Sequence, residues 1–162
     1  MAGKEFKKAI RIYADTSVLG GVFDFEFSAA SSKFLDQVKM KRFQLVISPV
    51  VEEEISEAPR RVQALYQSVA PLAELAPVTE AVVRLQQAYL RARILSSKWA
   101  RDALHVASAS ASGCRIIVSW NFRHIVHYKK IALYNAINIR EGYFPIGIHT
   151  PQEVIEYEKE EV

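Results

Sequence analysis

Half of the 162 residues are hydrophobic and 24% are charged, which excludes a disordered, collagen-like or coiled-coil chain. A chain of this length buries roughly 70% of the surface that its unfolded form exposes, so it can hold a core of its own. The net charge of +3 allows a nucleic-acid partner without requiring one.

Four short apolar runs rich in β-branched residues predict strands. Three of these runs are almost continuously apolar, as is typical of strands covered on both faces of a parallel sheet. Helix-length segments lie between them, several with apolar residues three or four apart. In chain order, the predicted strands are 9–14, 43–47, 115–119 and 146–149, and the predicted helices are 28–41, 50–57, 59–70, 79–94, 97–112, 125–141 and 151–157.

This alternation of strands and helices predicts an α/β fold with a mainly parallel sheet. In such sheets ligand sites gather at the carboxyl ends of the strands. The residues that directly follow each predicted strand are therefore the first candidates for a functional site.

Acidic residues follow the first two predicted strands. Asp15 comes directly after the first strand, where a turn or helix-cap role is its simplest interpretation. In the helix after the second strand, Glu52, Glu53 and Glu54 point in directions about 100° apart, so they cannot share one purpose. We expect Glu54 to lie near the inward side of this helix and the other two glutamates to be solvated.

A third acid, Asp102, lies in a helix that is otherwise built of small and apolar residues. Aspartate is a poor helix former beyond the first turn, and an unpaired buried carboxylate costs several kcal/mol. Asp102 therefore needs a cation, an arginine or a hydrogen-bond network. Arg101 points elsewhere on the helix, whereas His105 at i+3 is a better neighbour and is expected to be packed or hydrogen-bonded.

Ser119 and Asn121 follow the third predicted strand and offer neutral oxygens that can ligate a hard cation or hold its waters. If Asp15, Glu54 and Asp102 converge, their repulsion requires a counter-cation. Mg²⁺ or Mn²⁺ meets this need with oxygen ligands, and it supports chemistry at a phosphodiester. The sequence contains no GxxxxGK[ST] phosphate loop that would instead indicate nucleotide binding.

These residues resemble the PIN-domain family, and specifically its VapC-like ribonuclease branch from toxin–antitoxin systems. The resemblance spans about residues 10–126. It is carried, in order, by Ala14-Asp15-Thr16-Ser17-Val18-Leu19, Ile47-Ser48-Pro49-Val50-Val51-Glu52-Glu53-Glu54-Ile55, Asp102-Ala103-Leu104-His105-Val106-Ala107-Ser108-Ala109 and Ser119-Trp120-Asn121-Phe122-Arg123-His124-Ile125. It implies a three-layer α/β/α sandwich and an endoribonuclease that depends on Mg²⁺ or Mn²⁺.

The resemblance also implies a role for each site residue. Asp15, Glu54 and Asp102 match the three metal-binding acids, with Glu54 orienting a water or acting as general base. Asn121 stands where many members carry a further aspartate, which removes one negative charge from the site. We expect Asn121 to share one task in the site with Thr16 and Ser119.

The expected task of Thr16, Ser119 and Asn121 is to hold waters or phosphate oxygens. Single-stranded RNA is the expected substrate, since loops enter such a site more easily than duplexes. The resemblance further implies a homodimer and a small inhibitory antitoxin protein. The aromatic segment 23–27 is either a contact surface for these partners or a loop that folds its rings into the core.

Other hypotheses remain open. A PIN-fold module with weak catalysis would bind RNA or a protein partner. A phosphotransfer enzyme with Asp15 as nucleophile usually has a second aspartate two residues later, where this chain has Ser17. A zinc site would have to combine histidines of irregular spacing, His105, His124, His127 and His149. Trp99 and Trp120 are expected more often in core or interface packing than in base stacking.

We expect a single domain over residues 1–162, in which 127–162 extends past the minimal pattern without an assigned role. The lone Cys114 excludes an internal disulfide and a multi-cysteine zinc site. The N-terminus has no apolar stretch of signal-peptide length, and no apolar run approaches the roughly 18 residues of a membrane span. A cytoplasmic protein is therefore expected, with a solvated acidic segment at 156–161.

Overall fold

A five-stranded parallel sheet forms the centre of the computed structural model, which describes residues 8–157. The strand order is β3-β2-β1-β4-β5, so the first strand is central. Ile12 of β1 pairs with Leu45 of β2 on one side and with Ile116 of β4 on the other. The strands are β1 (Ile10–Ala14), β2 (Phe43–Ile47), β3 (Glu74–Leu75), β4 (Ile116–Val118) and β5 (Gly147–His149).

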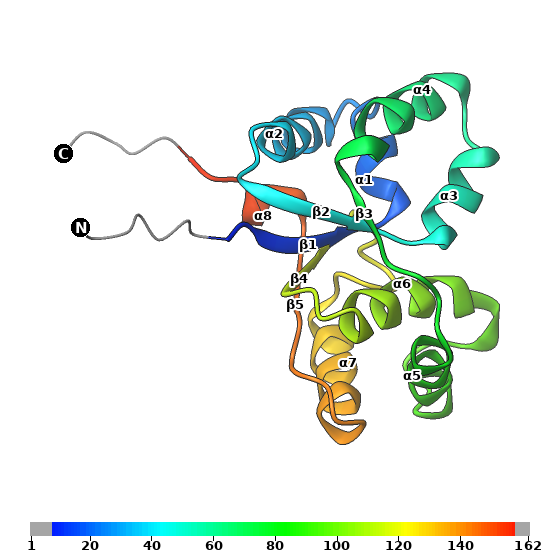
Figure 1. Ribbon diagram of the computed structural model, residues 1–162. Coiled ribbons are helices and arrows are strands. Elements are labelled where there is room, and N and C mark those ends of the chain that lie inside the picture. The colour runs from blue at the N-terminus through cyan, green and yellow to red at the C-terminus, as the bar shows by residue number, and fades with distance from the viewer. Residues whose placement is uncertain (1–7, 158–162) are drawn as a thin grey trace, which may run out of the picture.

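Helices cover both faces of the sheet and complete a three-layer α/β/α sandwich, which confirms the expected fold class (Figure 1). One layer holds α1, α2, α4 and α8, and the other holds α5, α6 and α7, while α3 stands beyond the carboxyl end of β2. The helices are α1 (Thr16–Gly21), α2 (Ser28–Lys39), α3 (Pro49–Ser56), α4 (Arg60–Val69), α5 (Glu80–Arg91), α6 (Ala100–Ala111), α7 (Tyr128–Arg140) and α8 (Pro151–Val154).

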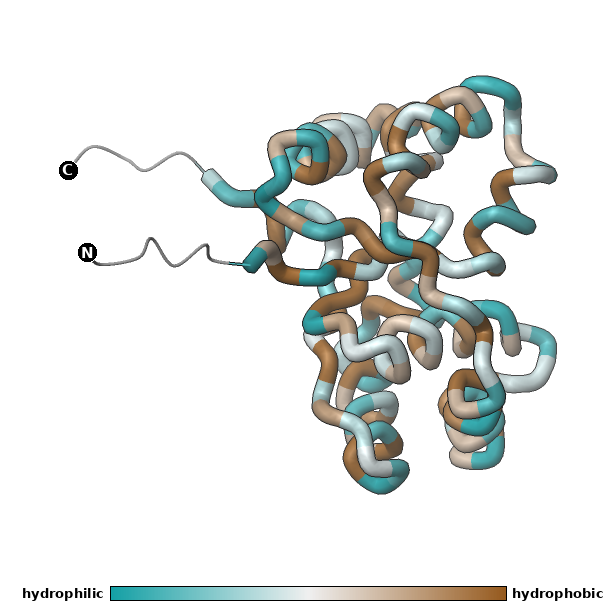
Figure 2. Tube along the Cα trace, viewed as in Figure 1, coloured by the Kyte–Doolittle hydropathy of each residue, from teal (hydrophilic) through white to brown (hydrophobic). Residues whose placement is uncertain are grey.

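The core lies on both faces of the central strand. Residues 12–14 of β1 are at most 3% exposed, in agreement with the near-continuous apolar sequence of a strand covered twice. Figure 2 shows the hydrophobic residues gathered on the strands and on the helix sides that face them. Because β1 is central and buried, the residue that follows it is held at the middle of the sheet's carboxyl edge.

Two short elements, α1 and β3, were not predicted from the sequence. α1 has six residues and contains Gly20 and Gly21, which are poor helix formers. β3 has two exposed residues, Glu74 and Leu75, too few to show a period. The expected last helix, 151–157, ends at Val154, and residues 158–161 of the expected acidic segment lie outside the described residues.

The C-terminal stretch continues the same sheet and its layers. After α7, β5 pairs in parallel with β4, and Gln37 of α2 exchanges two hydrogen bonds with the backbone of Glu156. Between residues 8 and 157, no helix is both long enough and apolar enough to span a bilayer.

Gly21→Ala is expected to destabilise the fold by about 1–3 kcal/mol, as overpacking does. An added Cβ would meet the Ser31 hydroxyl and the Trp120 ring nitrogen at 2.7 Å each, where these two groups already share a hydrogen bond. Gly20→Ala is the matched control, because nothing lies within 4 Å of its Cβ position. Urea unfolding of both variants measures the difference, and equal stabilities would contradict the packing at α1.

Candidate active site

The carboxylate of Asp15 is buried at the carboxyl end of β1, where it caps α1. Ser17 donates to its Oδ1 through the backbone N–H at 3.1 Å and the hydroxyl at 2.5 Å, and Ser119 donates to Oδ2 at 2.6 Å. The residue is 5% exposed. Burial raises the pKa of this carboxyl, against the opposing charge of His105 and the hydrogen bonds from Ser119 and Ser17.

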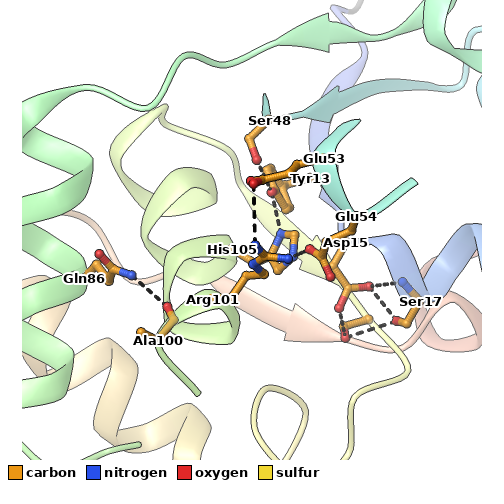
Figure 3. Close-up of polar contacts among 11 residues, drawn as sticks. Tyr13, Asp15, Ser17, Ser48, Glu53, Glu54, Gln86, Ala100, Arg101 and His105 are labelled. Atoms are coloured by element: carbon orange, nitrogen blue, oxygen red, sulfur yellow. Dashed lines mark hydrogen bonds and ion pairs between the residues drawn. The ribbon is translucent and has the colours of Figure 1, made fainter. Parts of the chain in front are cut away.

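Glu54 faces this position from α3, while its neighbours Glu52 and Glu53 are exposed as expected. Its carboxylate bonds to Nε2 of His105, and Figure 3 shows it between His105 and Asp15. Burial raises the pKa of the Glu54 carboxyl, but the hydrogen bond and charge of His105, together with the charge of Arg101 and a contribution from Thr16, outweigh burial, so the net pKa is lowered. Glu54 is therefore already ionised and held by the protein.

Asp102 lies half-buried in the first turn of α6. Burial raises the pKa of its carboxyl, against the charges of His124 and His105 and a hydrogen-bonding contribution from Asn121. The adjacent Arg101 instead pairs with Glu53 at 3.6 Å. Among the described residues, neither Asp15 nor Asp102 has an arginine or lysine partner, and each is costly to ionise.

Three neutral residues line the same edge. Ser119 is fully buried and accepts from the backbone N–H of Asn121 at 2.9 Å while it donates to Asp15. Asn121 accepts from the backbone N–H of His124 through its side-chain oxygen. The Thr16 hydroxyl is buried without a hydrogen-bond partner within residues 8–157, although it lies close enough to Glu54 to lower the pKa of that carboxyl. All three expected neutral residues thus lie beside the acids.

A buried polar chain behind the acids was not predicted from the sequence. The Tyr13 hydroxyl lies 2.7 Å from Ser48 Oγ and 2.7 Å from Nδ1 of His105. The expectation that His105 is hydrogen-bonded holds, but its partners are Tyr13 and Glu54. The only signal in the sequence was a tyrosine within the buried part of the first strand.

His105 is the common neighbour of the three acids. Its charge lowers the pKa of Asp15, of Glu54 and of Asp102. Glu54 in turn raises the pKa of both aspartates by like-charge repulsion. The three carboxylates, which come from β1, α3 and α6, therefore share one electrostatic environment.

The expected alternatives to this site find less support. Within the described part of the chain, no group of three or more His, Cys, Asp or Glu side chains is arranged to hold a metal ion, which applies to a histidine zinc site and equally to Asp15, Glu54 and Asp102 as a set of three. His127 accepts from the backbone of Lys129, and His149 contacts Glu153, so these histidines lie in separate environments from His105.

The two tryptophans pack against neighbouring rings. Trp99 stacks on His124 with ring centroids 4.4 Å apart. Trp120 stacks on Phe27 at 4.2 Å. Within the aromatic segment, Phe27 is thus packed, whereas Phe25 is fully exposed and Phe23 is partly exposed beneath Arg61. Phe27 thus packs within the protein, and a partner contact by the exposed Phe25 stays a prediction.

The chemistry of the donors fits a hard dication. Mg²⁺ usually keeps several waters and needs only one or two carboxylates, so a site can form without a ready cluster of three. Asp15 and Asp102 are two carboxylates whose ionisation burial disfavours and a cation would favour. The unpartnered Thr16 hydroxyl beside Glu54 adds a neutral oxygen to this set.

Solved structures share this fold, whereas no protein-family model and no curated protein match the sequence. One is a chain from the crystal structure of VapBC2 from Rickettsia felis bound to a DNA fragment from their promoter, with a TM-score of 0.55 and 11% identity. The match covers 87% of this chain and 98% of that one.

A chain from the crystal structure of FitAcB from Neisseria gonorrhoeae matches with a TM-score of 0.56 and 13% identity, over 88% of this chain and 99% of that one. Identities this low establish the fold alone. The fold is the PIN-like α/β/α sandwich implied by the resemblance to VapC-like proteins.

Proposed function

We propose that this protein is an endoribonuclease that depends on Mg²⁺ or Mn²⁺, and that it acts as the toxin of a toxin–antitoxin pair. One observation carries the proposal. Asp15 and Asp102 are held at the carboxyl edge of the sheet with raised pKa values and without a basic partner among the described residues. Such a pair is costly to a folded protein unless a cation completes it.

In this proposal each residue has a distinct task. Asp15 and Asp102 hold the dication, and Glu54 accepts a proton from the attacking water. When bound, the ion supplies positive charge for the phosphodiester oxygens and lowers the pKa of water. Thr16, Ser119 and Asn121 orient waters or phosphate oxygens through their hydroxyl and amide groups.

Single-stranded RNA is the proposed substrate. The edge of the site carries exposed cations at Lys98 and Arg123, and both lie over the Trp99 ring, at 5.1 and 5.8 Å from its centroid. Lysine and arginine bind phosphates, and unpaired loops reach a recessed site more easily than a duplex does.

Purified full-length protein is expected to cleave labelled single-stranded RNA when Mg²⁺ or Mn²⁺ is present, and to stop when EDTA removes the ion. Duplex RNA of the same sequence is the matched substrate control and should be cleaved more slowly. Product formation on a denaturing gel measures both. Cleavage that persists in EDTA, or no cleavage with either ion, would contradict the proposed function.

A homodimer and a small antitoxin are the proposed partners, and the exposed ring of Phe25 is a proposed contact. Phe25→Ala should leave the free energy of unfolding within about 0.5 kcal/mol, because an exposed ring has little to lose. It should weaken self-association, or binding of an antitoxin from an adjacent reading frame, in analytical ultracentrifugation. Unchanged assembly with both partners would remove Phe25 from the contact.

A catalytically weak PIN-fold module is the second candidate. Asn121 is neutral where many VapC-like proteins carry an acid, so the site holds one negative charge fewer. Tight binding of RNA or of a protein partner, without metal-dependent turnover, would favour this candidate over a nuclease.

A further inference from the structure

Four side chains form a continuous polar chain from the end of β2 to the edge of the candidate site. Ser48 and Tyr13 are fully buried, and His105 is 2% exposed. The hydroxyl oxygen of Tyr13 lies 2.7 Å from Ser48 Oγ and 2.7 Å from Nδ1 of His105. The other ring nitrogen of His105, Nε2, continues the polar chain to Glu54. The chain ends on a carboxylate that is still 27% exposed.

The chemistry of the groups sets the direction of each hydrogen bond. An ionised carboxylate only accepts, so Nε2 of His105 must carry the proton that it shares with Glu54. When His105 is neutral, Nδ1 is then an acceptor and the Tyr13 hydroxyl donates to it. In the protonated form, whose charge lowers the pKa of the three acids, Nδ1–H instead donates to the tyrosine oxygen. Burial raises the pKa of Tyr13 far above its ordinary value, so this phenol keeps its proton. Ser48 is left to donate to the tyrosine oxygen.

We propose that Tyr13 and His105 are positioning residues that orient Glu54 as the water-binding carboxylate, and that the dication is left to Asp15 and Asp102. This inference rests on the proposed nuclease function. His105 occupies one oxygen of Glu54 and fixes the plane of its carboxylate, while the other oxygen faces the site. Glu54 already has a basic partner in His105, whereas neither aspartate has an arginine or lysine partner among the described residues.

The chain does more than satisfy buried polar atoms. Tyr13 and Ser48 already hydrogen-bond to each other, so the tyrosine hydroxyl has a buried partner without His105. His105 instead connects this pair to a partly exposed acid 51 residues away in the sequence. Buried partners of this kind fix the geometry of catalytic groups, and their loss typically costs about 10- to 100-fold in activity or metal affinity.

A matched pair of substitutions at His105 distinguishes its contact with Glu54 from its contact with Tyr13. The amide of His105→Gln reaches the position of Nε2 and can still donate to Glu54, whereas the amide of His105→Asn reaches only that of Nδ1 and Tyr13. His105→Asn is expected to lower kcat by roughly 10- to 100-fold, as loss of a side chain that orients a catalytic group does, and to lower it about tenfold more than His105→Gln. The KM for RNA and the Mn²⁺ dissociation constant should change less than about threefold, since Asp15 and Asp102 are intact.

Two further variants complete the series. Tyr13→Phe, which removes one oxygen, should reproduce part of the loss in kcat. His149→Asn, at a partly exposed histidine that contacts Glu153 outside the site, should leave kcat unchanged. Equal losses in both His105 variants, or a loss that falls mainly on Mn²⁺ affinity, would overturn the positioning role.

The hydrogen-bond directions have a readout that does not depend on cleavage. Long-range ¹H–¹⁵N spectra of the full-length protein near roughly pH 8, above the ordinary histidine pKa, should show His105 as the Nε2–H tautomer. Tyr13→Phe should shift the Nδ1 resonance and Glu54→Gln the Nε2 resonance. The Nδ1–H tautomer, or resonances insensitive to both substitutions, would overturn the inference. The predicted spectra in a protein that cleaves no RNA would instead refute the nuclease proposal and leave the chain of contacts standing.

Discussion

Asp15→Asn and Asp102→Asn are each expected to lower metal-dependent RNA cleavage by more than about 100-fold, beyond the usual loss for a residue that only supports a metal ligand. Each substitution replaces a carboxylate oxygen by an amide group of nearly the same shape and removes one negative charge from the proposed ion site. Ser17 can still donate twice to the amide oxygen, and the Ser119 hydroxyl can turn to accept from the amide NH2, so the fold should survive. Initial cleavage rates at saturating Mg²⁺ measure the effect.

Asp36→Asn is the control for this series, because Asp36 is exposed on α2, away from the carboxyl edge of the sheet. It should cleave RNA at the wild-type rate. Circular dichroism of all variants would verify the fold. Cleavage by the Asp15 and Asp102 variants within a few-fold of wild type would mean that these acids do not hold the ion.

Metal ions are expected to stabilise the folded wild-type protein strongly. Mg²⁺ or Mn²⁺ at about 100 times its dissociation constant should raise the free energy of unfolding by about 2.7 kcal/mol. The physical reason is that the ion binds the two ionised aspartates in the folded state and relieves the cost of burying them. Urea unfolding at neutral pH, with EDTA and with Mn²⁺, measures the difference.

The free energy of unfolding without metal is expected to change with pH in a defined direction. The folded-state pKa values of Asp15 and Asp102 are raised, so between the unfolded value of about 3.9 and the folded value the folded state binds more protons. Without metal, these two groups make stability fall as pH rises through that window, and the loss persists above it. Glu54, whose pKa is lowered, contributes in the opposite direction.

Asp15→Asn should therefore raise the free energy of unfolding at neutral pH by about 0.5–2 kcal/mol in EDTA, as substitutions of strained functional groups often do. The same variant should lose the stabilisation by Mn²⁺. An Asp15 variant that is less stable than wild type across the neutral range, or one stabilised by Mn²⁺ as strongly as wild type, would contradict a metal site built on this buried acid.

Much of the site could be predicted because its acids are tied to regular elements. Asp15 follows a strand whose apolar run places it at the sheet's carboxyl edge, and Glu54 is selected from three glutamates by the rotation of a helix. Asp102 stands out because a carboxylate among small, apolar residues needs a partner, although α6 begins at Ala100 and so places Asp102 in the first turn, where an acid suits the helix dipole. Local sequence and the periods of helix and strand are enough to select these three positions.

The rest depends on contacts between residues far apart in the chain. Tyr13 meets His105 across 92 residues, and no local pattern encodes which buried histidine a strand tyrosine will contact. The short α1 and β3 were likewise missed, since six residues with two glycines and two exposed residues carry no periodic signal. Their placement is set by packing against neighbouring strands and helices rather than by propensity.

The clearest measurement of the central claim is an anomalous difference map from crystals of the protein soaked in Mn²⁺. One strong peak is expected, in contact with a carboxylate oxygen of Asp15 and one of Asp102, with Glu54 still bonded to His105. The peak should vanish in crystals of the Asp15→Asn variant. A peak on other residues, or none between the two aspartates at saturating Mn²⁺, would contradict a shared dication site.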